Sequence, residues 1–553
     1  MDKIPSFNSF VEQSIKDNWE RDALTDYKGA TLQFHDVARK IEKLHILFEN
    51  SELQRGDKVA LCGRNSSNWA VAFLATLTYG AVAVPIQHEF KPDQVYNIVN
   101  HSEAKLLFVG DVAATELDAG QMPMLEGVIY IPDFSLVASR SEKLAYAREH
   151  LNELFGQEYP KYFHREHVSY YHDEAEDLAL INYTSGTTGF SKGVMIPYRA
   201  LWGNADFAHN VLGAHIKPGD SIISILPMAH MYGMAFEFIF EFITGCHIFY
   251  LTRIPSPAII AEAFATIKPA VVIAVPLIIE KIIRKKVFPK VQNNKIRLLL
   301  NMPMISKKVK EKICEQVTAA FGGNFYEVII GGAAFNQEVE SFLKMIGFRY
   351  TVGYGATECA PIICYADHAT FTPGSCGRAA LHMQVRIDSH DPENVPGEIL
   401  AKGINVMLGY YKNPEATAAT IDKDGWYHTG DLGTMDGDGN VYIKGRSKNM
   451  LLGASGQNIY PEEIEDKLNS LALVNESVVI QEGEKLVGLV HPDYDEARSM
   501  GFSEEDMTNI MEQNREELNS MLPGYSKLTA IRIHEEEFEK TPKKSIKRYL
   551  YQK

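Results

Sequence analysis

The sequence predicts an α/β protein, with a large N-terminal domain of layered α/β subdomains plus a small β-barrel, followed by a small α+β C-terminal domain. Three observations support this fold class. The 553 residues are too many for one simple core. Short β-rich runs alternate with helical patterns in the first half of the chain, which is typical of parallel α/β layers. After Gly353 the pattern changes to short strands closed by turn residues.

The β-rich runs of the first half are KVALCG from Lys58, AVAVPI from Ala81, KLLFVG from Lys105 and GVIYI from Gly127. Further along, residues 397–400 predict a short strand. The Asp-Gly-Asp-Gly sequence at 436–439 is typical of a hairpin turn. We therefore expect strand-rich structure, in the form of a small barrel, beyond Gly353.

A further change of pattern near Lys448 predicts a separate C-terminal domain. A helix start is expected at Pro461, where two glutamates follow. A strand containing VVI and a long charged helix near residues 503–522 come next. We therefore predict an N-terminal domain over 1–447 and a C-terminal domain over 448–553.

Composition and charge indicate an ordinary folded protein. Hydrophobic residues make up 45% of the chain and charged residues 23%. The 55 Lys plus Arg against 71 Asp plus Glu give a net charge of −16. This acidic balance disfavours nucleic acid as the main partner, because phosphate backbones are bound by clustered Lys and Arg. A local basic site stays compatible with it, and the oligomeric state is not indicated.

Three features lead us to expect a cytoplasmic protein. The first twenty residues are polar where a signal peptide needs an apolar run. The most apolar stretch, 222–251, contains His230, Glu237, Glu241 and His247, and charges at mid-span are too costly for a membrane helix. The six cysteines form no CxxC pair and have no His partners at metal spacing, so neither a disulfide framework nor a zinc site is indicated.

The sharpest local feature is YTSGTTGFSKGV, residues 183–194. Its glycines and hydroxyl residues offer backbone N–H groups and side-chain donors, and Lys192 adds a point charge, so a phosphate is the natural ligand. A P-loop is disfavoured, because Ser191 and Gly193 stand where its second Gly and its Mg²⁺-binding hydroxyl should be. Pro197 favours strand, loop, strand over strand, loop, helix. A flexible linker is the alternative, but linkers rarely lie between two apolar strands.

This segment resembles the phosphate loop of the adenylate-forming (AMP-binding) superfamily of acyl-CoA synthetases, peptide-synthetase adenylation domains and luciferases. Six further segments resemble motifs of that family, in the order the family requires and along almost the whole chain. They are LPMAHMYG (226–233, substrate-side His), GGAA (331–334, adenine-wall loop), GYGATE (353–358, aromatic-Thr-Glu), GEILAKGINVMLGYYKNPEAT (397–417, strand-rich segment), WYHTGD (426–431, ribose) and GRSKNMLLGASGQNIYPEEIE (445–465, hinge).

The resemblance, of the acyl-CoA synthetase or long-chain fatty acid–CoA ligase type, implies ATP-dependent activation of a carboxylic acid, a medium- or long-chain fatty acid. Carboxylate and ATP give acyl-AMP and pyrophosphate, and acyl-AMP and coenzyme A then give acyl-CoA and AMP. A carboxylate resists attack by a thiol because its oxygen is a poor leaving group, whereas the mixed anhydride with AMP has a good one. ATP, Mg²⁺ and coenzyme A are the expected cofactors.

The resemblance also implies nucleotide contacts, residue by residue. Asp431 lies in a Gly-flanked turn and is suited to accept hydrogen bonds from the ribose hydroxyls, with Arg446 as a second ribose or phosphate contact. The alternatives are an Asp that closes a turn and a surface Arg. Tyr354 presents a flat ring for stacking on adenine, or is a core Tyr. The phosphate contacts are Thr184, Ser185, Gly186, Thr187, Thr188 and Lys192, and the adenine loop is Gly331, Gly332 and Ala333.

Metal-binding and catalytic roles are expected of three further residues. Glu358 is placed to hold Mg²⁺ against the ATP phosphates, and the Thr357 hydroxyl to touch the α-phosphate; a solvated loop Glu is the alternative. His230 begins an apolar, aromatic run where the family binds its carboxylic substrate. We interpret this run as one wall of an acyl pocket. A packed core helix is the alternative, because its phenylalanines are spaced i,i+4.

Lys448 occupies the hinge position of the family, about which the small domain is mobile, so that one active site serves both reactions. The loop 453–456, which ends at Gly456, is then expected to line the coenzyme A tunnel in the second state. A hairpin with no functional movement is the alternative.

The C-terminal signature departs from that of the family. The usual pattern has a catalytic Lys directly before an Ile, and an Arg two residues after that Ile. Here Ile546 and Arg548 match, but Ser545 takes the Lys position. A hydroxyl cannot supply the positive charge that bridges the substrate carboxylate and the α-phosphate. Lys544, one residue away, is our candidate for this role, and Lys543 is the second candidate. Solvated charges are the alternative.

Three functional hypotheses therefore compete: an acyl-CoA synthetase, a ligase that loads a carrier-protein thiol, and a nucleotide- and acyl-binding protein with impaired catalysis. The lack of an appended carrier domain weakly favours the first. Amino-acid activation is disfavoured, because no acidic residue near His230 is clearly placed to hold an ammonium group, although Glu237 is nearby.

The stretch 281–312 is rich in Lys and Arg. Such runs are usually solvated helix faces. The alternative is a contact for the 3′-phosphate of coenzyme A or a peripheral contact with an anionic membrane surface.

Overall fold

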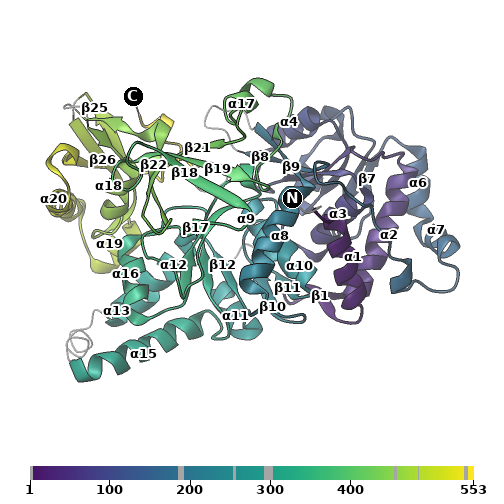
Figure 1. The fold of residues 1–553 in the computed structure, drawn as a ribbon, viewed down its shortest axis with the longest axis horizontal. Coiled ribbons are helices and arrows are strands. Elements are labelled where there is room, and N and C mark those ends of the chain that lie inside the picture. The colour runs from purple at the N-terminus through teal and green to yellow at the C-terminus, as the bar shows by residue number, and fades with distance from the viewer. Residues whose placement is uncertain are drawn as a thin grey trace.

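The computed structural model describes residues 4–184, 192–252, 257–291, 303–453, 457–483, 485–540 and 546–552. Its largest sheet has eight strands in the order β20-β9-β8-β4-β3-β5-β6-β7 (Figure 1). The strands are β3 (Lys58–Cys62), β4 (Val82–Ile86), β5 (Ala104–Val109), β6 (Gly127–Tyr130), β7 (Leu136–Ser139), β8 (Leu178–Thr184), β9 (Lys192–Pro197) and β20 (Gly409–Tyr410).

The centre of this sheet is parallel, as the alternating pattern predicted. The pairs β8 with β4, β4 with β3, β3 with β5 and β5 with β6 are parallel. The pairs at the two ends of the sheet, β6 with β7 and β9 with β20, are antiparallel. The sequence did not predict the strands β7 and β20 at these edges. β8 and β9 are also antiparallel, because the connection between them is too short for the crossover that parallel strands need.

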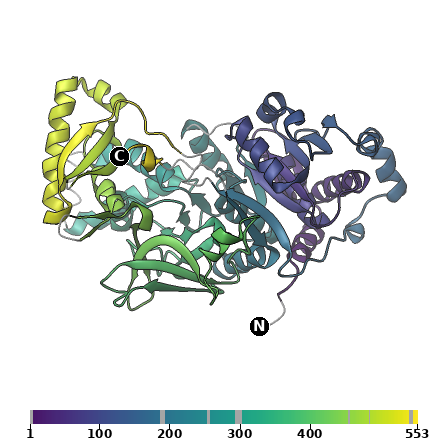
Figure 2. The ribbon, with the colours of Figure 1, turned by 90° about the horizontal axis from the view of Figure 1, so that it is seen from above.

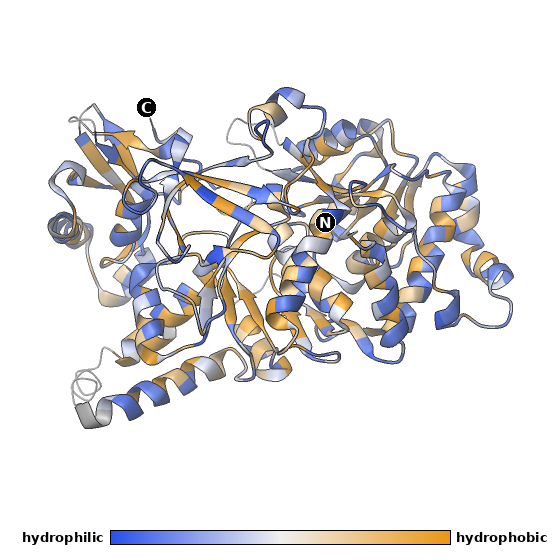
Figure 3. Ribbon diagram, in the orientation of Figure 1, coloured by the Kyte–Doolittle hydropathy of each residue, from blue (hydrophilic) through white to orange (hydrophobic). Residues whose placement is uncertain are grey.

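Alternate residues of the central strands pack into two hydrophobic clusters on opposite faces of the sheet. In β3, Val59 and Leu61 join one cluster, and Ala60 and Cys62 join the other. Helices α2 (Phe34–Asn50) and α3 (Ser67–Tyr79) belong to the first cluster, and α4 (Pro92–Ser102) to the second. Figure 3 shows these strands as a hydrophobic layer, while the outer helices also carry hydrophilic residues.

Two smaller sheets extend the N-terminal part. One has the order β10-β11-β1-β2, and the other is a parallel sheet with the order β12-β13-β14. Their strands are β1 (Asp22–Asp26), β2 (Thr31–Gln33), β10 (Ser221–Ser224), β11 (His247–Tyr250), β12 (Val272–Ala274), β13 (Val328–Ile330) and β14 (Tyr350–Val352). Loops that follow the carboxyl ends of β13 and β14 are the expected place for a ligand in such a sheet.

The strand-rich segment after Gly353 forms two antiparallel sheets. One contains β15 (Tyr354–Gly355), β16 (Ile362–Tyr365) and β17 (Arg378–Ala379). The other contains β18 (Met383–Asp388), β19 (Gly397–Gly403), β21 (Tyr427–Met435) and β22 (Val441–Arg446). The predicted hairpin turn at 436–439 joins β21 to β22. Within the described residues the strands pair as two open sheets, so the predicted small barrel is not closed by one continuous ring of hydrogen bonds.

The C-terminal part is a smaller α+β domain, as predicted, and stands beside the rest of the molecule in Figures 1 and 2. Its sheet, in the order β25-β26-β27, has a core of its own against α18 and α20. The elements are β25 (Val474–Glu482), β26 (Lys485–Pro492), β27 (Leu528–Ile533), α18 (Pro461–Leu468), α19 (Tyr494–Met500) and α20 (Glu504–Met521). The helix starts expected at 461 and near 503 are confirmed. The boundary at 447/448 stays a prediction.

The apolar stretch 222–251 is divided among short elements. After β10 come α9 (Met231–Met234), a π-helical turn η3 (Ala235–Ile239) and α10 (Phe240–Thr244), and then β11. In the part of the chain that the structure describes, no helix combines the length and the apolar character that crossing a membrane requires.

Candidate functional site

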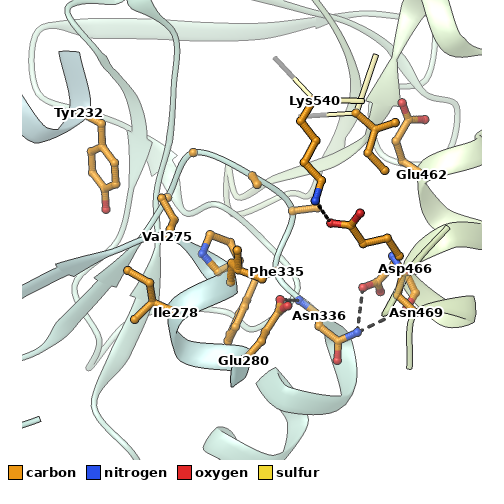
Figure 4. A pocket seen from close by; sticks show the side chains of 18 of the residues that line it. Tyr232, Val275, Ile278, Glu280, Phe335, Asn336, Glu462, Asp466, Asn469 and Lys540 are labelled. Carbon is orange, nitrogen blue, oxygen red and sulfur yellow. Dashed lines mark hydrogen bonds and ion pairs between the residues drawn. The ribbon is translucent and has the colours of Figure 1, made fainter. Parts of the chain in front are cut away.

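A large cleft lies between the N-terminal part and the small domain, and it brings the predicted site residues together. Those that line it are Thr184, Lys192, His230, Gly331, Gly332, Ala333, Tyr354, Thr357, Glu358, Asp431, Arg446 and Lys448. Five predicted residues, Ser185, Gly186, Thr187, Thr188 and Gly456, lie outside the described residues, as do Lys544 and Ser545. Figure 4 shows part of this cleft, with Tyr232 on one side and Lys540 and Asp466 on the other.

The phosphate-loop motif spans the hairpin between β8 and β9. Thr184 and Lys192 form the last cross-strand pair before the turn. This is the strand, loop, strand arrangement that Pro197 predicted, and it differs from a P-loop, in which a helix follows the loop. The Lys192 ammonium lies 4.6 Å from the centre of the Tyr410 ring. This cation–π contact holds the ammonium group at the end of β9 that is next to the turn.

Tyr410 also contacts the predicted metal ligand. Its hydroxyl donates a hydrogen bond of 2.9 Å to Glu358, and the Met407 N–H donates to the Glu358 carbonyl at 2.8 Å. Because β20 pairs with β9, Tyr410 stands between Lys192 and Glu358. Sequence reasoning included Tyr410 in a motif but assigned it no role. The contact arises from pairing between residues far apart in sequence, which spacing does not reveal.

A buried carboxylate organises the nucleoside side of the cleft. Asp431 lies within β21 and not in the predicted turn, opposite Arg446 on β22. Arg446 Nε donates to Asp431 Oδ1 at 2.8 Å. The Tyr354 hydroxyl donates to Asp431 Oδ2 at 2.5 Å. Asp431 is 6% exposed, and burial raises its pKa while the Arg446 charge opposes that shift. A carboxylate fixed in this way at the cleft wall is suited to accept hydrogen bonds from two adjacent hydroxyls.

The loop after β13 forms another part of the wall and requires glycine at two positions. A Cβ on Gly331 would lie 3.1 Å from Cζ of the Tyr232 ring, and Gly332 has a φ of +90°. The Tyr232 hydroxyl donates to the Ile329 carbonyl at 3.1 Å, which holds the ring against this loop. Gly331 is buried against this ring, whereas Gly332 is exposed in the cleft, where a flat ligand can approach the backbone closely.

The aromatic run after His230 is partly wall and partly core. His230 caps the short helix α9, where its Nδ1 accepts a hydrogen bond from the Tyr232 N–H at 3.3 Å. Phe236 lines the cleft, whereas Phe238 and Phe242 are fully buried in the core. One part of the run therefore lines the cleft and another part belongs to the core, and the acyl pocket stays a prediction. Apolar lining that the sequence did not predict comes from Phe207, Val211, Leu212, Leu251, Ile260 and Tyr365.

Glu237 belongs to the interior and not to the cleft. It is fully buried, and its Oε2 accepts hydrogen bonds from the N–H groups of Ile225 and Leu226 at 3.0 and 2.8 Å. Burial raises the pKa of this carboxyl well above its ordinary value. It is thus engaged at the end of β10 and is not placed to pair with an ammonium group in the cleft.

The end of the chain faces the cleft from the small domain. Ile546, Lys547 and Arg548 line it, while the described residues of the hairpin β23 (Leu451–Leu452) and β24 (Asn458–Ile459) do not. Both terminal nitrogens of Arg548 bind the carboxylate of Glu465 on α18. This ion pair fixes the C-terminal segment to the helix that borders the large domain.

Family models match the chain along most of its length. A model described as AMP-binding enzyme matches residues 11–411, and one described as AMP-binding enzyme C-terminal domain matches residues 448–553. The chain belongs to the AMP-binding enzyme family. The resemblance noted from the motifs is thereby confirmed, together with the expectation of an enzyme.

Among known proteins, this AMP-binding enzyme is similar to "Long-chain-fatty-acid--CoA ligase" of Salmonella typhimurium, with 28% identity over 75% of this chain and 72% of that protein. It is also similar to "Long-chain-fatty-acid--CoA ligase 5" of Mus musculus, with 28% identity over 92% of this chain and 80% of that protein. A crystal structure of the anthranilate CoA ligase AuaEII with anthranoyl-AMP has the same fold, with a TM-score of 0.77, 19% identity and coverage of 100% and 97% of the two chains.

Replacing Asp431 with Ala in this AMP-binding enzyme should weaken the use of ATP. A charge-assisted hydrogen bond contributes about 1.5–3 kcal/mol, so we expect KM for ATP to rise or kcat/KM to fall about 10- to 150-fold. Steady-state kinetics at varied ATP provide the measurement. The control is Asp438→Asn in the exposed turn between β21 and β22. Unchanged KM for ATP and unchanged kcat in Asp431→Ala would contradict the assignment of Asp431 as a ribose contact.

Tyr410→Phe should lower the affinity for Mg²⁺, so that activity needs a higher Mg²⁺ concentration, while the ring stays beside Lys192. Loss of a partner that orients a metal-binding carboxylate typically lowers metal affinity or activity by about 10-fold or more. The activity is measured as a function of Mg²⁺ at fixed ATP. Tyr411→Phe is the matched control, because the Tyr411 hydroxyl contacts Glu103 at 3.4 Å on the surface. Equal Mg²⁺ curves for the two variants would contradict a role for Glu358 in holding the metal.

Arg548→Ala should destabilise the small domain, because it leaves the buried Glu465 without its charged partner. The side chains of this pair are 16% and 7% exposed, and breaking a buried pair costs about 3–5 kcal/mol. Thermal unfolding and hydrogen exchange of residues 461–470 measure the loss. Arg532→Ala breaks the exposed pair with Glu482 and should cost much less, because solvent screens an exposed ion pair. If Arg548→Ala loses no more stability than Arg532→Ala, the ion pair with Glu465 does not stabilise the small domain as we predict.

Proposed function

We propose that the chain is an AMP-forming acid–thiol ligase that activates a medium- or long-chain fatty acid and transfers the acyl group to coenzyme A. The observation that carries this proposal is one cleft with two chemically different sides. Asp431, Arg446, Lys192 and Glu358 form a polar side suited to a nucleotide, and an apolar side begins at His230. The names of the two ligase relatives support the choice of a fatty acid.

In the first step, a carboxylate oxygen of the acid attacks the α-phosphorus of ATP, and pyrophosphate leaves. Asp431 orients the ribose, and Tyr354 forms the wall beside the adenine. Lys192 and the loop that it closes hold the departing phosphates through charge and N–H groups. Glu358 fits a magnesium ion, because carboxylate oxygens are the ligands it prefers, and the ion would neutralise phosphate charge when bound.

In the second step, the sulfur of coenzyme A attacks the acyl carbon and AMP leaves. The acyl chain lies against Phe236, Phe207 and Val211, which exclude water from the mixed anhydride. The interior position of Glu237 supports an uncharged acyl chain over an amino acid.

A panel of carboxylic acids of graded chain length tests this proposal. AMP release is measured with ATP and coenzyme A, and in parallel with a carrier protein that bears a pantetheine thiol. We expect the highest rates with medium or long acids and coenzyme A. Faster transfer to the carrier protein would favour the carrier-loading ligase, and ATP binding without AMP release from any acid would favour the binding protein.

The origin of the positive charge for the first step is a separate proposal. We assign it to Lys544, since Ser545 occupies the position of the usual lysine. Trapping of acyl-AMP with hydroxylamine in Lys544→Ala should show a loss of about 100-fold or more, the size of one electrostatic contribution to a transition state.

The companion variants Lys527→Ala and Ser545→Lys complete that experiment. Lys527 is exposed and does not line the cleft, so its removal should leave the rate nearly unchanged. If Lys544→Ala behaves as the wild type, the assignment is wrong. A large gain in Ser545→Lys over a nearly inactive wild type would support the binding protein.

A further inference from the structure

A polar cluster that lines the cleft joins the two domains. On the large domain it comprises Glu280 of α12 (Pro276–Ile282), Arg284 of η4 (Ile283–Val287) and Asn336, which caps α16 (Gln337–Ile346). On the small domain it comprises Asp466 of α18 and Ser470 just beyond that helix. Figure 4 shows Asn336 pointing from the large domain to Asp466, with Glu280 beside it and bonded to its backbone N–H.

Asn336 is the centre of this cluster. It is 5% exposed, and its Nδ2 donates to Ser470 Oγ at 2.7 Å and to Asp466 Oδ1 at 3.2 Å. Its Oδ1 accepts from Arg284 at 3.1 Å and from the Val339 N–H at 3.2 Å, the latter being the helix cap. Every polar atom of the side chain thus has a partner, and the partners belong to both domains.

Asp466 binds the start of α16 from the other domain. Its carboxylate accepts from Asn336 Nδ2. Burial raises the pKa of Asp466, and the backbone N–H of Gln337, the first residue of α16, opposes that shift. A negative charge is favoured at this end of a helix, because the first N–H groups lack partners within the helix and the helix dipole is positive there. The small domain therefore supplies an anion to a helix of the large domain.

The cluster is linked on both sides to the site. Asn336 follows Ala333 by three residues, so it belongs to the same loop that forms the adenine wall. Asp466 follows Glu465, which holds Arg548 and with it the C-terminal segment at the cleft. A rotation of the small domain that withdraws this segment must separate Asp466 and Ser470 from Asn336.

We propose that Asn336 and Asp466, with Ser470 and Arg284, form an interdomain latch that holds the small domain in the orientation that presents the C-terminal segment for acyl-AMP formation. This inference rests on the proposed function. These are positioning residues, since they act through the orientation of the domain. The latch favours the first half-reaction and has to open before the second.

The test exchanges donor and acceptor across the interface. Asn336→Asp keeps an oxygen that caps α16 but places a second carboxylate against Asp466. We expect formation of acyl-AMP to fall at least 10-fold, and formation of acyl-CoA from supplied acyl-AMP to change less than twofold. In the double variant Asn336→Asp with Asp466→Asn, the amide and the carboxylate change places, and acyl-AMP formation should return to within threefold of the wild type.

Hydrogen exchange measures the latch without catalysis. In Asn336→Asp, the segments 335–340 and 461–470 should exchange faster, and the double variant should restore their protection. Glu505→Gln, a loss of charge at an exposed position of α20, is the control and should change neither assay. Should Asn336→Asp fail to fold, Ser470→Ala removes a latch partner without touching the cap of α16 and is examined in the same way.

Equal losses in both half-reactions, unchanged exchange in both segments, or no recovery in the double variant would overturn the latch. If the wild type forms no acyl-AMP from any acid, the proposed function fails. In that case, hydrogen exchange of the segments 335–340 and 461–470 in the single and double variants still tests the latch, because this measurement does not depend on catalysis.

Discussion

The buried carboxylate of Asp431 is the contact on which the nucleoside side of the cleft depends. It binds the Tyr354 hydroxyl and the Arg446 guanidinium, so one group ties β15, β21 and β22 together. Burial penalises its charge, and the two donors offset that penalty. The same donors fix the orientation of both carboxylate oxygens. A group held this firmly can select a ligand by geometry, because it does not have to be ordered when the ligand binds.

The local elements could be predicted from the sequence. Strands that begin at 58, 82 and 104 and the helix start at 461 follow from apolar runs and from Pro and Glu at a helix N-terminus. The family motifs then led to the residues that line the cleft, including Asp431 and Tyr354. Motif order is informative here because the strand arrangement brings the motifs to one cleft. The phosphate, His and adenine-loop motifs follow β8, β10 and β13, whereas most of the ribose motif lies within β21.

Contacts between distant segments could not be predicted. The roles of Tyr410 and Asn336 depend on β20 pairing with β9 and on the small domain meeting α16. Arg284 belonged to a basic run interpreted as a solvated face, yet it contacts Asn336 and Ser470, whereas Lys307 and Lys308 of α15 (Pro303–Ala320) are exposed as expected. Hydrophobic periodicity and motif spacing describe residues that are neighbours along one helix or strand. They do not show which other helix or strand packs against that element.

The two-residue strand β20 has a consequence for how the protein acquires its site. Gly409 and Tyr410 pair with Met195 and Val194, so the edge of the largest sheet is completed by a segment more than two hundred residues later in the chain. Contacts of such separation form late in folding, because a long loop must close first. A chain folded only through its N-terminal layers would therefore have the phosphate hairpin but no Tyr410 beside Lys192. Nucleotide would then bind selectively to molecules in which folding is complete, and its binding would reduce the population of partly folded forms.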